Sequence, residues 1–225
     1  MPIVSTKPLQ LMSERPVAHK PRLRGWIHFI AAPLSLAASI VLVVLAPTTG
    51  LKWASAVYLA SSLILFGVSA AYHLFYWSPE ATALLRRLDH SNIFLLIAGT
   101  YTPLSVALLQ GSHRVALLWI IWVGAAIGIL INLLWPTAPR WLSTLIYVVL
   151  GWTAIWYLPS FWQAGGPAVV WLILGGGLLY TIGAVVYATK EPNPWPRVFG
   201  FHEIFHLFTV LAWASQCVAA YLAVL

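Results

Sequence analysis

Long apolar runs dominate the chain after its first 25 residues. Each run is close to the roughly 20 residues that a helix needs to cross the hydrocarbon core of a bilayer. The runs do not alternate polar and apolar residues, as the strands of a membrane barrel would. We therefore predict an all-α, integral membrane bundle of seven transmembrane helices, at residues 26–46, 53–77, 91–110, 115–135, 141–161, 168–188 and 200–223.

Short segments with helix-breaking residues separate the runs. Examples are Ser78-Pro79, Gly165-Gly166-Pro167 and the proline-rich stretch 191–197. None of these segments is long enough for a water-soluble domain. The predicted organisation is a short basic tail at residues 1–25, followed by one seven-helix transmembrane domain at residues 26–225.

Composition agrees with a membrane protein. Of the residues, 61% are hydrophobic and only 8% are charged, whereas ordinary globular proteins have about 25% charged residues. The single cysteine, Cys217, excludes an intramolecular disulfide framework. A net charge of +7 would suggest a nucleic-acid partner for a soluble protein. In a membrane protein basic residues first mark topology, so no nucleic-acid partner is expected.

The basic residues predict the orientation. If the N-terminal tail is cytoplasmic, ten of the 12 lysines and arginines fall on that side of the membrane. These ten are Lys7, Arg15, Lys20, Arg22, Arg24, Arg86, Arg87, Arg140, Lys190 and Arg197, and the other two are Lys52 and Arg114. Because cytoplasmic loops are enriched in Lys and Arg, we expect the N-terminus inside and, with seven spans, the C-terminus outside.

A few ionisable residues in or beside the spans are candidates for a functional site, because such residues are costly in a membrane. His73 ends the second predicted helix, Asp89 precedes the third, and His202 and His206 begin the seventh. These three positions border even-numbered loops, so they share the cytoplasmic face. His202 and His206 are four residues apart and project from one side of their helix, as do Ser69 and His73. Three imidazoles and one carboxylate can therefore converge.

Three neutral imidazoles suit zinc, because three protein ligands with a fourth position left to water form the usual catalytic arrangement. Asp89, the only aspartate in the chain, is expected to accept a hydrogen bond from the bound water rather than to bind the metal. The alternative for each histidine is an ordinary hydrogen bond between helices.

A second motif overlaps this site. Residues 202–206 read His-Glu-Ile-Phe-His, which matches the H-E-x-x-H pattern of zinc proteases, in which the glutamate is the general base. An intramembrane metalloprotease would use the two histidines with Asp89 as ligands. That interpretation leaves His73 unexplained, and Glu203 could instead face the lipid headgroups.

Together the motifs resemble the haemolysin III proteins, the bacterial branch of the progestin and adipoQ receptor (PAQR) superfamily, which is related to adiponectin receptors and alkaline ceramidases. The resemblance extends from about Arg24 onward and rests on Ser69-x-x-x-His73, Arg87-Leu-Asp89-His90-Ser-Asn92 and Gly200-Phe-His202-Glu-Ile-Phe-His206. It implies a multi-pass protein of the bacterial cytoplasmic (inner) membrane with a cytoplasmic N-terminus. It also implies that His73, His202 and His206 bind zinc, that Asp89 holds the water, and that Ser69 lies beside it. The longer N-terminal region of the animal receptors is missing, so no protein-hormone partner is expected.

Our leading hypothesis is a zinc-dependent hydrolase that cleaves a lipid amide or ester, such as a ceramide-like molecule, and so contributes to membrane lipid homeostasis. Asp89 would pass the proton of the water to the leaving group, and Ser69 would orient the water or donate to the developing oxyanion. The alternative is a non-enzymatic, receptor-like sensor of the membrane state with structural zinc. A pore-forming haemolysin is disfavoured, because no span has a repeated polar face.

Two glycines at Gly124-x-x-x-Gly128 would allow helices to approach closely. They could pack within one bundle or form the interface of a homodimer.

Overall fold

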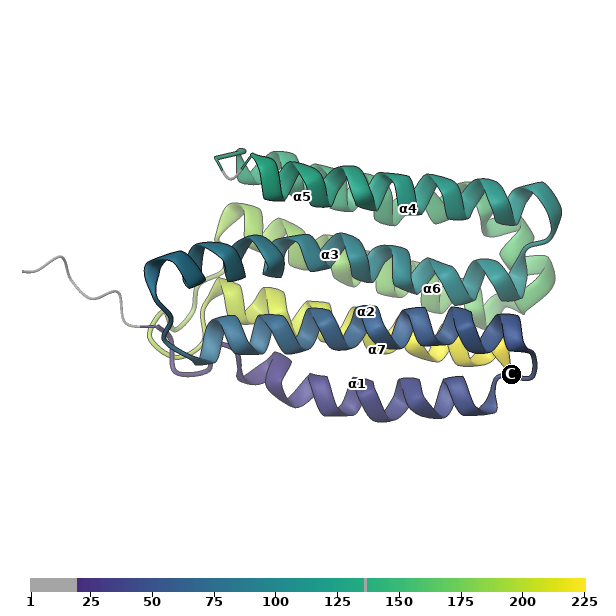
Figure 1. Ribbon diagram of the computed structural model, residues 1–225, viewed down its shortest axis with the longest axis horizontal. Coiled ribbons are helices and arrows are strands. Elements are labelled where there is room, and N and C mark those ends of the chain that lie inside the picture. The colour runs from purple at the N-terminus through teal and green to yellow at the C-terminus, as the bar shows by residue number, and fades with distance from the viewer. Residues whose placement is uncertain (1–19, 136) are drawn as a thin grey trace, which may run out of the picture.

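The computed structural model describes residues 20–135 and 137–225 and consists of helices aligned along one long axis (Figure 1). The elements are α1 (Trp26–Leu45), α2 (Thr49–Leu74), α3 (Pro79–Leu108), α4 (Gly111–Leu134), α5 (Arg140–Gly151), the 3-10 helix η1 (Trp152–Tyr157), α6 (Leu158–Thr189) and α7 (Phe201–Val224). No strand occurs in the described ranges. The all-α prediction is confirmed there, while most of the predicted tail, residues 1–19, lies outside the described residues.

Six helical segments of the described chain are long and apolar enough to cross a membrane. Five are α1, α2, α3, α4 and α7, and the sixth is the 49-residue segment Trp141–Thr189, which includes most of α5 and all of η1 and α6. The predicted spans 141–161 and 168–188 both lie in this segment. The number of crossings therefore stays a prediction, whereas the multi-pass character is clear.

The long segment is interrupted where the glycines and proline predicted a break. Gly166 has φ 76° and ψ 179°, so the backbone leaves helical geometry there. Glycine adopts a positive φ without the steric cost that a side chain brings, and Pro167 follows it. The two parts of α6 on either side of Gly166 are therefore not one continuous helix.

The start of the third helix differs from the prediction. We expected residues 91–110, but α3 begins at Pro79, so Asp89 lies inside the helix and not ahead of it. Ser78 caps the helix, because its Oγ accepts a hydrogen bond from the backbone N–H of Ala81 at 3.2 Å. Pro79 fits the first turn, where its missing N–H costs nothing. Hydropathy shows where a helix becomes apolar. It does not locate the start of a helix whose first turns are polar, as those of α3 are.

The glycine pair of α4 packs inside the bundle. A Cβ on Gly124 would lie 2.6 Å from Leu150 Cδ1 of α5, and one on Gly128 would lie 2.3 Å from Phe94 Cζ of α3. Both glycines therefore admit side chains of neighbouring helices of the same chain. Of the two explanations of this motif, packing within one bundle is the one that the structure bears out. Homodimer formation itself stays a prediction.

The arrangement of the helix ends positions the candidate site. In Figure 1, the α2–α3 and α6–α7 connections lie at the same end of the bundle as the start of α1, and α7 ends at the opposite end. The end of α2, the first turns of α3 and the start of α7 are thus brought together, as the even-numbered-loop argument predicted.

Candidate metal centre

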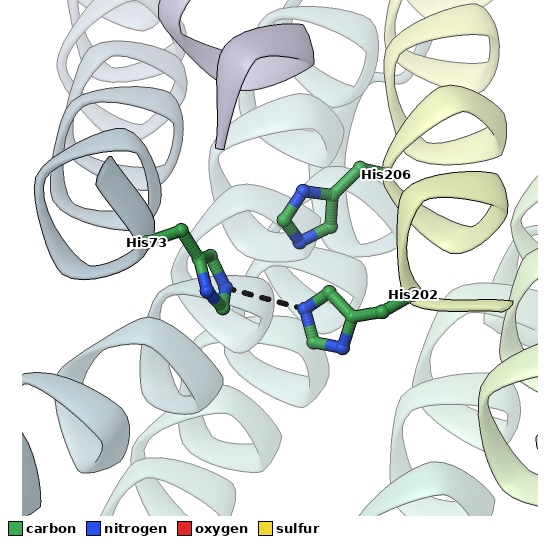
Figure 2. Close-up of side chains that lie close together, drawn as sticks. All are labelled: His73, His202 and His206. Carbon is green, nitrogen blue, oxygen red and sulfur yellow. Dashed lines mark hydrogen bonds between the residues drawn. The ribbon is translucent and has the colours of Figure 1, made fainter. Parts of the chain in front are cut away.

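Three histidines from two helices gather at this end of the bundle (Figure 2). His73 is the last residue but one of α2, and His202 and His206 lie in the first two turns of α7. The ring centroids are 4.6 Å apart for His202 and His206, 4.8 Å for His73 and His202, and 5.0 Å for His73 and His206. His73 and His206 are buried, and His202 is partly buried. The structure therefore brings together all three predicted ligands.

The donor geometry of the three histidines suits a metal ion. One ring nitrogen from each residue lies within 4.8 Å of the other two, and the Nε2 atoms of His73 and His202 are 3.2 Å apart. Two nitrogens bound to one tetrahedral zinc at about 2.0–2.1 Å would be about 3.3 Å apart. The His73–His202 pair already has this spacing, and His206 supplies a third donor. The cluster could hold a metal ion.

Asp89 and Ser69 lie beside the histidines. Asp89 Oδ2 is 3.6 Å from His73 Nε2, and its side chain is only 12% exposed. Ser69 lies one turn before His73 on α2, next to the Asp89 carboxylate. Its buried hydroxyl has no hydrogen-bond partner among the described residues. A buried hydroxyl is rarely left without a partner, so Ser69 Oγ is available to a ligand or water at the centre. The roles assigned to both residues stay predictions.

A fourth histidine, His28, belongs to the same cluster. His28 of α1 is buried. Its ring stacks on that of His206, with centroids 3.8 Å apart and an interplanar angle of 11°. Neither ring nitrogen has a partner among the described residues. The signal in the sequence was an ionisable residue in the first turn of a helix that begins at the site's end of the bundle.

Glu203, the glutamate of the H-E-x-x-H pattern, is occupied elsewhere. Its Oε2 accepts a hydrogen bond from the backbone N–H of Gly200 at 2.7 Å, and its Oε1 accepts one from Arg24 Nε. Glu203 is buried, and the Arg24 side chain is 21% exposed. The alternative in which Glu203 faces the lipid headgroups is therefore wrong. Both carboxylate oxygens are engaged in holding the start of α7 to the segment that precedes α1.

That preceding segment, residues 20–25, lies across the site's end of the bundle. The backbone N–H groups of Arg22 and Leu23 donate to the carbonyls of Arg197 and Val198, at 3.1 and 3.2 Å. Lys20 Nζ donates to the carbonyl of Phe75 at 2.9 Å, and partial burial, together with the Arg24 charge, lowers the pKa of Lys20. The segment therefore links the α6–α7 connection to the end of α2.

Gly25 ends this segment in a conformation that suits only glycine. Its φ is 87°, and a Cβ there would lie 2.9 Å from the Cβ of His73. A side chain at this position would therefore combine an unfavourable backbone conformation with a clash against the centre.

His90 connects the centre to α5 and α6. Its Nε2 is 2.9 Å from the hydroxyl of Tyr187, and its Nδ1 is 2.7 Å from the carbonyl of Arg86. Because a carbonyl only accepts, Nδ1 carries a proton, and in the neutral ring Nε2 accepts from Tyr187. The Tyr187 ring lies 5.8 Å from that of His202. His90 therefore contacts the candidate ligand His202 indirectly, through Tyr187.

An apolar cavity begins within about one turn of the centre. It lies between α2, α3, α5, η1, α6 and α7. Leu65 on α2, Ile93 on α3 and Phe205 on α7 line the part nearest Ser69, Asp89 and His206. Most other lining residues are aliphatic or aromatic, with a few hydroxyls such as Thr209. This lining suits an apolar ligand.

Most of this sequence is similar to sequences of known proteins. Residues 17–217 match a model of the haemolysin-III-related family. Hemolysin-3 of Bacillus cereus is 34% identical over 186 residues, which are 81% of this chain and 82% of that protein. The Hemolysin-3 homolog of Bacillus subtilis (strain 168) is 31% identical over 199 residues, or 86% and 90% of the two chains.

A more distant match reaches the animal proteins. The adiponectin receptor protein of Drosophila melanogaster is 28% identical in an alignment of 179 residues, which covers 69% of this chain but only 39% of the receptor. The resemblance seen in the three motifs is thus confirmed over residues 17–217. The chain belongs to the haemolysin III family, a branch of the PAQR superfamily.

Proposed function

We propose that this protein is a zinc-dependent membrane hydrolase that cleaves a lipid amide or ester, of which a ceramide-like molecule is the model substrate. The observation that carries the proposal is the convergence of His73, His202 and His206 beside Asp89, within about one turn of an apolar cavity.

Zinc is the metal that fits the donors best. Three neutral nitrogens with no carboxylate among them suit zinc and leave a fourth position for water or substrate. Bound there, zinc would lower the pKa of a water and polarise the substrate carbonyl. The Nε2–Nε2 separation of 3.2 Å between His73 and His202 supports this assignment.

The residues of the chain would move the protons. Asp89 would accept the proton of the water that attacks the carbonyl carbon. As the bond to the leaving nitrogen or oxygen breaks, Asp89 would return that proton to the leaving group. Ser69, with its unpartnered hydroxyl, would donate a hydrogen bond to the charge that develops on the carbonyl oxygen. His28, stacked on His206, would hold that ring in position.

The cavity would bind the acyl chain, with membrane lipids as the partners. Its apolar wall removes water around the chain, and the few hydroxyls orient the polar group near the centre. We further propose that the segment Trp141–Thr189 crosses the membrane twice, turning at Gly166. At 1.5 Å per residue its 49 residues would span roughly 74 Å, more than twice the hydrocarbon core. Two crossings there give seven in total.

The same proposal places the centre at the cytoplasmic face of a bacterial inner membrane. Arg24, Arg86, Arg87 and Lys190 lie near the end of the bundle that holds the histidines, and Lys52 and Arg114 follow the helix starts at the other end. This distribution supports a cytoplasmic N-terminus and an external C-terminus.

The test measures zinc and turnover on the same samples. Purified wild-type protein should hold about one zinc per chain and release fatty acid from a long-chain ceramide-like amide. His73→Ala, which removes one ligand, should reduce both, with turnover falling by more than about a hundredfold. The matched control is His113→Ala, an exposed histidine of α4, which should change neither. Turnover that survives His73→Ala would refute the hydrolase assignment for this site.

A non-enzymatic sensor with structural zinc is the second candidate, and the origin of the ligands supports it. His73 comes from α2 and the other two from α7, so a metal would tie two separate helices together. In that case chelation should lower the melting temperature of the wild type by mass action, and no lipid would be turned over. A metalloprotease is disfavoured, because both oxygens of Glu203, its required base, are engaged by Gly200 and Arg24.

A further inference from the structure

A second, polar pocket lies beside His90. It is formed by the first turns of α3, the end of α4, the start of α5 and the end of α6, and its space with the opening is about 700 Å³. Its wall includes Arg86, Arg87, His90, Asn132, Trp135 and Ser143. None of the described residues that line it is acidic. We call it the arginine pocket.

No carboxylate of the described residues forms a salt bridge with the arginines of this pocket. Among the described residues, the carboxylates that lie within 4.0 Å of a basic side chain are Glu203, beside Arg24, and Asp89, beside His73. Arg86 therefore faces no carboxylate within salt-bridge distance. Arg87 makes one long contact, from Nη1 to the carbonyl of Leu133 at 3.5 Å, while its buried Nε has no partner among the described residues. A buried guanidinium N–H without an acceptor is costly, so the pocket favours an anion with several acceptor oxygens.

The pocket wall is held in place by its own hydrogen bonds. Ser143 Oγ donates to Asn132 Oδ1 at 3.0 Å, and Asn132 Nδ2 donates to Tyr147 at 3.3 Å. The Tyr147 hydroxyl donates to the carbonyl of His90 at 3.0 Å, and His90 Nδ1 donates to the carbonyl of Arg86. These bonds connect α3, α4 and α5, so a ligand would not have to order the wall before binding.

The position of the pocket selects the source of the anion. It lies where the apolar part of α4 ends, and Trp135 on its wall is half exposed, as expected of an indole at the headgroup level of a membrane. Arginines at this level meet the phosphates of lipid headgroups, and guanidinium groups bind phosphate through charge-assisted, often bidentate hydrogen bonds. The phosphate of a membrane lipid is already present at the depth of this pocket. A free phosphate would first have to leave bulk water, so the position favours the lipid as the source.

We propose that the arginine pocket binds the phosphate of an anionic phospholipid headgroup. The site is separate from the histidine cluster, and its binding does not require the protein to be a hydrolase. His90 and Tyr187 line this pocket, and Tyr187 also packs against His202. A bound headgroup would thus lie next to a residue that contacts the metal centre.

The experiment compares two lipids with identical acyl chains. Purified full-length protein in a neutral detergent is incubated with equal amounts of phosphatidylglycerol and phosphatidylcholine, and native mass spectrometry counts the lipids that remain bound. The wild type should prefer phosphatidylglycerol. Arg86→Gln, a change at an exposed side chain, should reduce the preference by about fivefold, and R86Q/R87Q should reduce it by more than about tenfold.

The control removes the same charge elsewhere on that end of the bundle. K190Q/R197Q changes two exposed residues that do not line the pocket, and it should keep the wild-type preference. An equal loss in this variant would overturn the proposal, because the attraction would then be a general effect of charge. The absence of any preference in the wild type would also overturn it, and that measurement does not depend on a variant's folding.

A third arm tests the source of the phosphate. Inorganic phosphate alone is added to the wild type and to Arg86→Gln, and thermal unfolding is followed. We expect no stabilisation at concentrations at which the lipid binds. Stabilisation of the wild type alone, together with no lipid preference, would identify a free-phosphate site and refute the lipid assignment. Because zinc content is a separate readout, failure of the hydrolase assignment would leave these results unchanged.

Discussion

Two helices that follow each other in the chain, α3 and α4, have opposite surroundings. Of the most apolar part of α3, 72% is buried inside the protein, whereas only 22% of that of α4 is buried. The inner helix carries Asp89, Asn92 and Thr100, and the outer helix turns residues such as Val123 and Ile127 outward. A polar group in a bilayer must find its partner in the protein. The least apolar helices therefore lie inside, and that is where chemistry can be placed.

The largest test removes Arg24, the cation that pairs with the buried carboxylate of Glu203 at the start of α7. Arg24→Ala leaves the Glu203 carboxylate buried without its cation, and we expect the free energy of unfolding to fall by about 3 to 5 kcal/mol. Thermal unfolding in detergent measures the loss. Arg22→Ala, which removes an exposed arginine two residues away, is the control and should have little effect. Equal losses in the two variants would mean that the pair contributes nothing specific.

The next test places a charge on the outer helix. Val123 is 46% exposed near the middle of α4, so a lysine there would have no partner in the protein. We expect Val123→Lys to cost about 3 kcal/mol on insertion, seen as a smaller membrane-integrated fraction in cell-free translation with membranes. Val123→Leu should insert like the wild type. If Val123→Lys inserted equally well, α4 could not face lipid in the way the contrast requires.

The smallest test compares two glycines. A Cβ on Gly99 of α3 would lie 1.9 Å from Ser61 Oγ, whereas one on Gly67 of α2 would meet nothing within 4 Å. Ser61 Oγ already donates to the carbonyl of Tyr58, so it cannot move away freely. We expect Gly99→Ala to lower the free energy of unfolding by about 1 to 3 kcal/mol.

The Gly67→Ala control should be neutral, or stabilising by up to about 1 kcal/mol, because alanine favours the helix. Melting temperatures in the same detergent rank the two variants. A Gly99→Ala protein as stable as the Gly67→Ala protein would show that α2 and α3 are not closely packed there.

The sequence predicted correctly those features that depend on a single physical rule. The hydrophobic runs located α1, α2, α4 and α7 to within a few residues, because lipid imposes apolar character over a fixed length. Counting loops then placed His73, Asp89 and the two histidines of α7 at one end, and the structure brings them together. Whether they bind zinc and catalyse stays a prediction, because spacing fixes proximity and not occupancy.

The misses have a common cause. The polar first turns of α3 are helical because Ser78 and Pro79 start the helix, a local signal that hydropathy ignores. The stacking of His28 on His206 and the pairing of Arg24 with Glu203 join opposite ends of the sequence. No periodicity reveals such a pair. It depends on which helices become neighbours, and that is decided by packing of the whole bundle.

The distance along the sequence between His73 and His202, 129 residues, also sets an order of events during biosynthesis. A ribosome delivers α2 and α3 to the membrane long before α7 has been made. Until that last helix inserts, His73 and Asp89 have no histidine partners from α7. A metal ion could be held by all three histidines only after α7 has been made, so a chain truncated before α7 would lack the three-histidine cluster, however well its earlier helices had inserted.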